Sequence, residues 1–355
     1  MKKNILISTG GSGGHVVPAT IFYEHLQGEF NMFMTSDDRG IKFLDKDKYN
    51  TEIIDTPKLS KNIFELPFKI ILLLYSTIKS FFYLRIKKID ILISTGGYMS
   101  LPFCIASKIL NIRLFLYEPN MVLGRSNKLF LSSCIKIFCY SDKIKKFPLK
   151  FKNKILLIPA LLRKEFYIIE KTKNVDKEIN LLIIGGSQGA KLFENIIESI
   201  VKIKKKYKLK IFHQTSVKNY MNLKNNYLLN NIESELFYFN ENISEFMKKS
   251  NLCITRAGAS TLAELIFLNL PHIAIPLPSA KDNHQLENAL FYKELGCNWV
   301  LNQNEINDLN LTDQLINIIE NKKEFLEKKN NMKNFSYQNT WNNINQKIIK
   351  IINEN

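Results

Sequence analysis

Cysteine is scarce in this chain, and the few cysteines are not arranged as a disulfide framework. Five occur among 355 residues, none is part of a C-x-x-C pair, and most lie inside apolar runs. That distribution is typical of reduced core residues in a cytoplasmic protein. We therefore expect reduced, buried thiols at Cys104, Cys134, Cys139, Cys253 and Cys297.

Long uncharged apolar runs are also lacking. The apolar segment at residues 64–88 is interrupted by Lys69 and Lys79 before it reaches the length of about 20 residues that crossing a membrane needs. The N-terminus, MKKNILISTGG, has only three large apolar residues before its glycines. It therefore predicts a first β-strand and not a signal peptide.

Acidic residues are outnumbered by basic ones. The chain has 33 Asp and Glu against 50 Lys and Arg, which gives a formal net charge of +17. Such an excess favours an anionic partner: nucleic acid, a phosphorylated substrate or an acidic membrane surface. Lys, Asn and Ile are abundant throughout, however, and a bias in base composition would produce the same excess. The charge by itself therefore does not choose among these partners.

Length and composition indicate two globular domains. A chain of 355 residues is too long for one ordinary α/β core, and 45% hydrophobic with 23% charged residues is an ordinary globular composition. A charged run without strand signals, residues 163–178, separates two halves. We therefore place an N-terminal domain at residues 1–162 and a C-terminal domain at residues 163–337.

A unit of apolar strand, glycine turn and helix recurs along the chain. ILISTGG stands at residues 5–11 and again at 91–97, and INLLIIGGSQG at 179–189 opens the second half in the same way. Repeats of this unit build parallel sheets covered by helices. The predicted fold is α/β, with two Rossmann-like domains whose parallel sheets face a cleft. Other strands are expected at residues 31–35, 114–117, 135–140, 155–158, 211–214 and 236–239, with a helix at 190–200 and a helical tail after Leu309.

The first glycine turn, TGGSGG at residues 9–14, is a weak signal for a dinucleotide site. Val16 stands where G-x-G-x-x-G has its last glycine. Asp37 and Asp38 nevertheless follow the next strand, where a dehydrogenase binds the ribose of its cofactor, so that class stays open. His15, at the mouth of the turn, has two readings: a helix residue that caps its own backbone, or a general base.

Residues 251–289 predict an anion site followed by a sugar site. A strand at 252–255 leads through a turn of small and hydroxyl residues into a helix at 261–269, whose first N–H groups favour an anion. Glu264, one turn into this helix, has two readings: a capping-box carboxylate, or a carboxylate that binds a ribose diol. A second strand at 272–276 ends in a loop of polar side chains that suit sugar hydroxyls: Asp282, Asn283, His284, Gln285 and Asn288.

The pair Asp45 and Asp47 has the D-x-D spacing of a site for a metal-bound nucleotide sugar. The pair lies among Lys42, Lys46 and Lys48 in a polar run. We therefore expect surface charges there and no metal site.

Residues 64–88 predict a helix with two apolar faces. One face can pack on a sheet and carries Ile70, Leu74, Thr77, Phe81 and Leu84. The opposite face carries Phe68, Leu72, Tyr75 and Ile78 beside Lys79. Either both faces are buried, or the second face rests on an anionic lipid surface.

Five motifs together resemble the MurG family of bacterial glycosyltransferases, which belongs to glycosyltransferase family 28. They are GGSGGHVVPA at residues 10–19, GGYMSLP at 96–102, GGSQGA at 185–190, TRAGASTLAEL at 255–265 and KDNHQLENA at 281–289. They cover nearly the whole chain in order. The resemblance implies the GT-B fold, with the C-terminal helix, about residues 338–355, crossing back to the first domain. It also implies transfer of N-acetylglucosamine from UDP-N-acetylglucosamine to the undecaprenyl-linked acceptor lipid I, which makes lipid II for peptidoglycan.

The resemblance further implies a peripheral protein on the cytoplasmic face of the inner membrane. Its partners would be the donor, lipid I, the anionic membrane surface and other cell-wall synthesis proteins, with no nucleic acid, cofactor or metal ion. The family commonly shows His-Glu-Gln-Asn where this chain has Tyr117, Glu118, Pro119 and Asn120. Asn120 is therefore retained while its neighbours differ.

By motif position, the resemblance implies a set of substrate contacts. Donor contacts would be Ser187 to phosphate, the Ile243 backbone to uracil, and Glu264 to ribose. Phosphate and sugar would also meet the helix end at Ala259, Ser260, Thr261, Leu262 and Ala263, and the sugar hydroxyls would meet Gln285 and Asn288. The donor and acceptor side would be completed by Ser12, Gly13, Gly14, Asn120 and Arg163.

The implied mechanism is a single inverting displacement. The 4-hydroxyl of the muramoyl sugar attacks the anomeric carbon, a base takes its proton, and UDP leaves against the helix N–H groups. We expect His15 to be the base, with Glu118 as the second candidate. Two other classes stay open: a diacylglycerol glycosyltransferase with the same donor site, and a nucleotide-dependent dehydrogenase, which needs only the first half.

Overall fold

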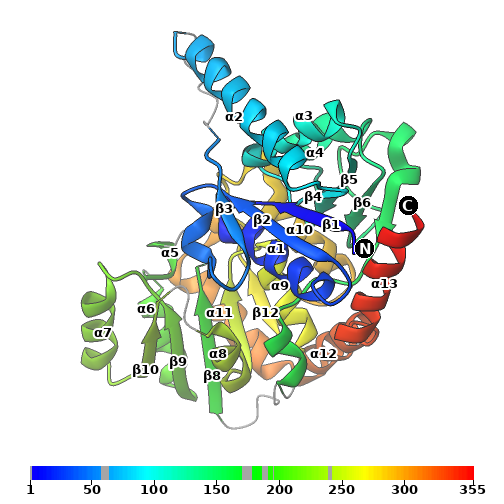
Figure 1. The fold of residues 1–355 in the computed structure, drawn as a ribbon. Helices are drawn as coiled ribbons and strands as arrows, with labels where there is room; N and C mark the ends of the chain where they lie inside the picture. Colours follow the sequence, from blue (N-terminus) through cyan, green and yellow to red (C-terminus); the bar gives the residue numbers. More distant parts are fainter. Residues whose placement is uncertain (1, 57–63, 170–177, 186–190, 195, 239–241) are drawn as a thin grey trace. The chain divides into compact units, whose positions relative to one another are not determined.

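The computed structural model describes residues 2–56, 64–169, 178–185, 191–194, 196–238 and 242–355 (Figure 1). The chain divides into two compact units. The first is Met1–Arg163 with Thr340–Asn355, and the second is Lys164–Asn339. Each unit contains one parallel sheet. Ser187, which was expected to contact the donor, lies outside the described residues.

The first unit is built on a seven-stranded parallel sheet in the order β3-β2-β1-β4-β5-β6-β7. Chain order reverses between β1 and β4, and ligands of open α/β sheets bind at the carboxyl ends of strands at such a point. Ile5, Leu6 and Ile7 of β1 have no exposed surface, as expected for a parallel strand covered on both faces. The strands are β1 (Asn4–Ser8), β2 (Asn31–Ser36), β3 (Thr51–Ile53), β4 (Ile91–Ser94), β5 (Arg113–Glu118), β6 (Lys136–Cys139) and β7 (Ile155–Leu157).

The helices of the first unit include the last helix of the chain. They are α1 (Gly13–Leu26), α2 (Leu66–Ile86), α3 (Leu101–Ile109), α4 (Arg125–Phe130) and α13 (Trp341–Glu354), with short 3-10 helices at Gly40–Phe43, Tyr98–Ser100 and Leu149–Lys154. The isoleucines of α13 recur at helical spacing and are buried: Ile344, Ile348, Ile351 and Ile352. This stripe packs α13 against α1 within the unit.

Helix α2 is supported along only part of its length. Its buried residues all lie in its second half, which packs on α3. Figure 1 shows the first half projecting away from the other helices of the unit. Of the face predicted to pack on the core, Thr77 and Leu84 are buried and Phe81 is half-buried, so the prediction is confirmed for the second half of the helix. Ile70 and Leu74 are 44% and 58% exposed, so it is wrong for the first half, and the alternative in which both faces are buried is also wrong. Apolar periodicity identified the two faces of α2, but it did not show how far along α2 the supporting helix α3 extends.

Residues of the predicted lipid-facing side of α2 are mostly exposed. Phe68 is 60% exposed, and Tyr75 and Ile78 are each 56% exposed, whereas Leu72 is half-buried. Among the described residues, α2 is the helix long and apolar enough, by length and composition alone, to cross a membrane.

The second unit has a six-stranded parallel sheet in the order β10-β9-β8-β11-β12-β13. The strands are β8 (Glu178–Ile184), β9 (Lys208–Gln214), β10 (Glu233–Phe237), β11 (Leu252–Thr255), β12 (His272–Ala274) and β13 (Trp299–Val300). The helices are α5 (Lys191–Glu194), α6 (Ile197–Lys204), α7 (Tyr220–Leu229), α8 (Ile243–Lys249), α9 (Ala259–Phe267), α10 (His284–Glu294), α11 (Asp308–Glu320) and α12 (Lys322–Ser336). Short 3-10 helices lie at Lys164–Ile168, Lys281–Asn283 and Gln303–Glu305.

The structure tests three further predictions from the sequence. The helix expected over residues 190–200 is described as two pieces, α5 and α6. The cysteines are all buried and free of disulfide bonds, as expected. The D-x-D pair is exposed, and Asp45 Oδ1 accepts hydrogen bonds from the N–H groups of Asp47 and Lys48 in a surface turn, so its reading as surface charge is confirmed.

Candidate active site

Two glycine turns lie side by side at the carboxyl ends of β1 and β4. The strands pair in register, and both Gly11 and Gly97 adopt φ of 80°. Met99 packs against both turns: a Cβ on Gly11 would lie 2.2 Å from its Cε, and one on Gly97 would lie 2.9 Å from its Sδ. Positive φ and this close contact together require glycine at both positions.

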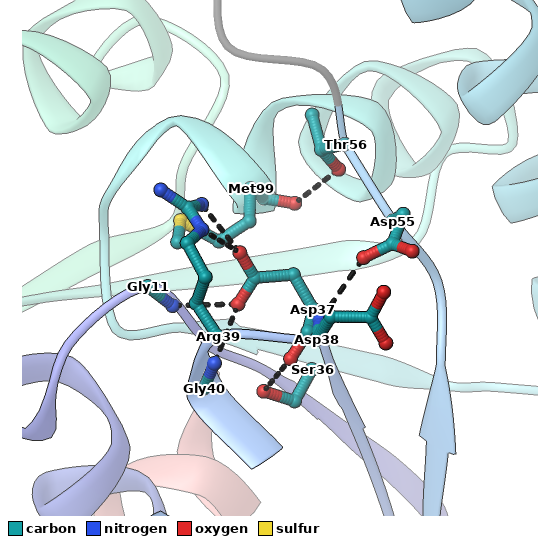
Figure 2. Close-up of polar contacts among 9 residues, drawn as sticks. All are labelled: Gly11, Ser36, Asp37, Asp38, Arg39, Gly40, Asp55, Thr56 and Met99. Carbon is teal, nitrogen blue, oxygen red and sulfur yellow. Dashed lines mark hydrogen bonds and ion pairs between the residues drawn. The ribbon is translucent and has the colours of Figure 1, made fainter. Parts of the chain in front are cut away.

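Asp37, at the end of β2, organises the first of these turns (Figure 2). Its Oδ1 accepts hydrogen bonds from the N–H of Gly11 at 2.7 Å and from the N–H of Gly40 at 2.9 Å. Its Oδ2 accepts from Arg39 Nε at 2.9 Å, and the side chain is buried. A carboxylate occupied in this way is not placed to bind a ribose. The main reason for considering a dehydrogenase is thereby removed.

His15, the third residue of α1, is half-buried beside the second glycine turn. Its Nδ1 lies 2.8 Å from the carbonyl oxygen of Thr95. A carbonyl only accepts, so Nδ1 carries the proton, and in the neutral ring the basic lone pair is on Nε2. Nε2 lies 3.4 Å from where a Cβ of Gly97 would be. The reading of His15 as a residue that caps its own backbone is wrong, because its ring binds a segment 80 residues away.

Residues 12–14 form the start of α1. Ser12 is the N-cap residue, and its carbonyl accepts from the N–H groups of His15 and Val16. The N–H groups of Gly13 and Gly14 therefore precede the helical hydrogen-bond ladder. A helix start of this kind favours an anion.

The loop after β5 is organised by Glu118 rather than left open for catalysis. One carboxylate oxygen accepts from the backbone N–H and Nδ2 of Asn120, at 3.2 and 3.0 Å. The other accepts from the N–H of Gly124 at 2.7 Å and from Nδ2 of Asn127 at 3.0 Å. Burial raises the pKa of Glu118, and these donors act in the opposite direction. With four donors around a buried carboxylate, Glu118 is a poor second candidate for the base.

Tyr117, where the chain departs from the family pattern, lies in the hydrophobic core of the first unit. Tyr117 is fully buried, packs edge-on against Phe22, and its hydroxyl bonds the hydroxyl of Tyr140. Asn120 is half-buried in the loop that follows.

Arg163 follows β7 and is half-buried. It is the last residue of the first unit before the C-terminal helix of that unit.

The second unit presents a helix start at the carboxyl end of β11. Gly258 is the N-cap residue of α9, and Leu262 N–H donates to its carbonyl at 3.0 Å. The N–H groups of Ala259, Ser260 and Thr261 therefore precede the ladder. The side chains of Leu262 and Ala263 are buried.

Glu264 is the sixth residue of α9, whereas a capping-box carboxylate stands at the third helical position. No side chain caps this helix, so the capping reading of Glu264 is wrong. The side chain is 7% exposed. The ribose reading is compatible with a buried carboxylate behind the N–H groups of the first turn of this helix.

Three side chains tie the loops of this edge together. Gln285 Oε1 accepts from Leu277 N–H at 3.0 Å, and the buried Asn288 donates from Nδ2 to the carbonyl of Ala257 at 3.2 Å. Arg256 donates to the carbonyl of Ile275 at 3.2 Å and to Gln303 Oε1 at 2.8 Å. The turn after β11, the loop after β12 and the start of α10 thus form one connected edge. Ile243, the first residue of α8, is half-buried.

Sequence reasoning missed the organising roles of Asp37, Glu118 and Arg256. Asp37 was considered as a ribose ligand, Glu118 as a base, and Arg256 only as a turn residue. One signal was available, since each lies within two residues of the end of a predicted strand. Their partners, however, lie in other segments of the chain.

Doubly wound parallel sheets with helix starts at their carboxyl edges define the class by its fold: two Rossmann-like domains of the GT-B type. The crystal structure of Acinetobacter baumannii MurG matches with a TM-score of 0.77 and 24% identity, covering 99% of this chain and 100% of that one. The predicted fold is thereby confirmed. The glycosyltransferase family 28 N-terminal domain matches residues 5–139, and the family 28 C-terminal domain matches residues 180–344. The chain belongs to glycosyltransferase family 28.

Relatives of known name are similar over the full length. A protein of Pelagibacter ubique (strain HTCC1062) is 60% identical over 356 residues, covering all of both chains. One of Rickettsia canadensis (strain McKiel) is 35% identical over 331 residues, 91% of this chain and 92% of that protein. Both are named UDP-N-acetylglucosamine–N-acetylmuramyl-(pentapeptide) pyrophosphoryl-undecaprenol N-acetylglucosamine transferase.

Proposed function

We propose that this protein transfers N-acetylglucosamine from UDP-N-acetylglucosamine to the 4-hydroxyl of the muramoyl sugar of lipid I, which forms lipid II. The observation that carries the proposal is the 60% identity, over the whole of both chains, to the Pelagibacter ubique transferase. Family 28 models that match both halves of the chain support it.

For the donor we infer a site in the second unit at the start of α9. The N–H groups of Ala259, Ser260 and Thr261 would bind the diphosphate, since a helix start acts as about half a positive charge. Glu264 would bind the ribose hydroxyls, and Gln285 the sugar. The donor contacts implied by motif position also include Ser187, Ile243, Leu262, Ala263 and Asn288.

For the acceptor we infer a site in the first unit. The N–H groups of Gly13 and Gly14 at the start of α1 suit the diphosphate of lipid I. Ser12, Asn120 and Arg163 would complete the donor and acceptor contacts.

The chemistry follows from these two sites. The 4-hydroxyl oxygen attacks the anomeric carbon, the bond from that carbon to UDP breaks, and the configuration inverts. His15 Nε2 takes the hydroxyl proton, a contribution of roughly a hundred- to ten-thousand-fold in rate. The N–H groups that bind the diphosphate in the ground state also stabilise the negative charge that develops on the departing UDP.

We further infer that α2 attaches the protein peripherally to the cytoplasmic face of the inner membrane. The contact would involve Phe68, Leu72, Tyr75, Ile78 and Lys79. Lys79 Nζ lies 4.7 Å from the ring centroid of Tyr75, an arrangement of basic and aromatic groups that suits an anionic headgroup region. Ser76 Oγ donates to the carbonyl of Asp55 at 3.0 Å, which ties α2 to the unit. We therefore expect α2 to lie on the membrane and not to cross it.

The test is an assay with the purified protein, lipid I in anionic phospholipid vesicles, and radiolabelled UDP-N-acetylglucosamine. We expect labelled lipid II, and no product when diacylglycerol replaces lipid I. UDP-N-acetylglucosamine should also raise the melting temperature more than UDP-N-acetylgalactosamine does. Glycosylated diacylglycerol as the main product would instead support the related lipid glycosyltransferase and reject the lipid I acceptor.

A further inference from the structure

Thr9 and Thr95 occupy the same position in the repeated sequence ILISTGG, and the fold brings them together. β1 and β4 are parallel and pair Ser8 with Ser94, so each threonine follows its strand at the same edge of the sheet. The hydroxyl of Thr95 donates to the hydroxyl of Thr9 at 2.8 Å. Both residues are buried.

Thr95 is bound at its main chain as well. Its N–H donates to the carbonyl of Ser8 at 3.2 Å, and its carbonyl accepts the hydrogen bond from His15 Nδ1 at 2.8 Å. The hydroxyl, the N–H and the carbonyl of Thr95 are thus all hydrogen-bonded, which fixes the backbone at this residue. The direction in which this carbonyl points decides which tautomer His15 adopts and how its ring is oriented.

We propose that Thr9 and Thr95 are positioning residues for His15. Their hydroxyl pair holds the Thr95 carbonyl where it accepts from Nδ1, which leaves Nε2 as the basic nitrogen beside Gly97. Neither threonine touches substrate in this role; both act through the imidazole. The inference rests on the proposed function of His15 as the base.

Valine replacements separate positioning from mere packing, since valine has nearly the shape of threonine but no hydroxyl. Thr95→Val leaves the buried Thr9 hydroxyl without its donor, whereas in Thr9→Val the Thr95 hydroxyl still has the Ser8 carbonyl at 3.5 Å, and the double variant has neither hydroxyl. Thermal stability should therefore fall most in Thr95→Val, fall less in Thr9→Val and recover in the double variant. The catalytic constant should fall by about tenfold to a hundredfold in Thr95→Val and should not recover in the double variant.

Two further measurements make the test independent of folding. In a His15→Ala background, Thr95→Val should cause no additional loss of turnover, because the residue through which it acts is gone. Nitrogen-15 NMR of the histidine rings should report Nδ1–H for His15 in the unsubstituted protein and a mixture of tautomers in the double valine variant. Thr20→Val is the matched control, since Thr20 bonds the carbonyl of Val17 within the same helix as His15 and should leave turnover unchanged.

The outcomes are distinct. Recovery of turnover together with stability in the double variant, or an equal loss from Thr95→Val in the His15→Ala background, would overturn the positioning role. Full turnover in His15→Ala would reject the base itself, which is a failure of the proposed function. An unchanged His15 tautomer in the double valine variant would reject the positioning role whatever the activity shows.

Discussion

The indole ring of Trp341 stacks on the imidazole of His25, with ring centroids 3.8 Å apart and planes 25° from parallel. His25 belongs to α1 and Trp341 opens α13, so the contact ties the C-terminal helix to the helix that carries His15. Neither ring nitrogen of His25 has a hydrogen-bond partner among the described residues. The ring is therefore buried without an acceptor that would stabilise its charged form.

Acid should destabilise the first unit through His25. Burial lowers the pKa of His25 from 6.5 to about 4, and Glu24 offsets this only in part. Between these values the unfolded chain binds a proton that the folded unit does not. The free energy of unfolding is therefore undiminished above pH 6.5 and falls by about 1.4 kcal/mol for each pH unit below it until the folded pKa is reached. His25→Phe, which keeps a ring on Trp341, should remove this slope, measured by guanidinium unfolding with Trp341 fluorescence.

Two other histidines provide the comparison. Burial also lowers the pKa of His213 to about 3 and of His272 to about 4, and both lie in the second unit. Unfolding of that unit should keep its acid slope in His25→Phe. A full acid slope of the Trp341 signal in His25→Phe would show that this pair does not control acid stability.

Adjacent aspartates should differ in their effect on stability. Asp37→Ala removes the charged acceptor of the Gly11 and Gly40 N–H groups and should lower the free energy of unfolding by about 2–4 kcal/mol. Asp38 is exposed, and its backbone N–H donates to Asp55 Oδ1 at 3.0 Å (Figure 2). The neighbouring Asp55 side chain raises the pKa of the Asp38 carboxyl. Asp38→Asn relieves a carboxylate pair at neutral pH and should leave the melting temperature unchanged or slightly higher. Equal losses in the two variants would reject the organising role of Asp37.

His15→Ala should lower the catalytic constant by roughly a hundred- to ten-thousand-fold, with little change in the dissociation constant of UDP-N-acetylglucosamine. The reason is that the ring acts on the acceptor hydroxyl, whereas donor contacts are expected in the second unit. The rate of the unsubstituted enzyme should fall at acid pH as the ring is protonated, and the residual rate of the variant should lack this acid limb. Turnover and pH profile are measured with the lipid I assay. An acid limb that persists in His15→Ala would assign it to another group.

Glu264→Gln should weaken binding of UDP by about tenfold to a hundredfold, because a hydrogen bond to a charged group contributes about 1.5–3 kcal/mol. Since UDP contains the ribose but not the N-acetylglucosamine, isothermal calorimetry with UDP isolates this contact. The melting temperature without ligand is measured beside it, which separates loss of the ribose contact from loss of stability. Glu294→Gln, at the exposed end of α10, is the control. Unchanged UDP affinity in Glu264→Gln would remove Glu264 from the donor site.

Replacing Phe68, Tyr75 and Ile78 of α2 by serine should release the protein from anionic vesicles, with a loss of partitioning of at least about a hundredfold. The melting temperature should be unaffected, because these side chains are already exposed. Turnover of a short-chain soluble acceptor should also persist. Sedimentation with vesicles measures the partitioning.

A matched control for this prediction lies in the second unit. Val217, Met221 and Leu228, in and next to α7, are 78%, 63% and 62% exposed. Their replacement by serine should leave vesicle binding unchanged. Equal release by both triple variants would mean that general apolar exposure, and not α2, controls attachment.

The sequence by itself determined the elements and their class. The predicted strand at residues 252–255 agrees to the residue with β11, because a parallel strand buried on both faces is a continuous apolar run that ends at a turn. Recurrence of the strand and glycine turn then determined the doubly wound sheets, since right-handed crossovers leave few alternatives. The carboxyl edge as the site of function followed from that topology.

Only the tertiary structure decided what each polar side chain binds. Asp37 reaches the N–H of Gly11, 26 residues away, and His15 reaches the carbonyl of Thr95, 80 residues away. Local sequence could not separate a ribose ligand from a turn organiser, or a cap from a base, because a hydrogen bond depends on distance in space between segments distant along the chain. The exposure of Ile70 and Leu74 had the same origin. Periodicity places residues on a face of a helix, but the packing of α3 beside α2 decides which part of that face is buried.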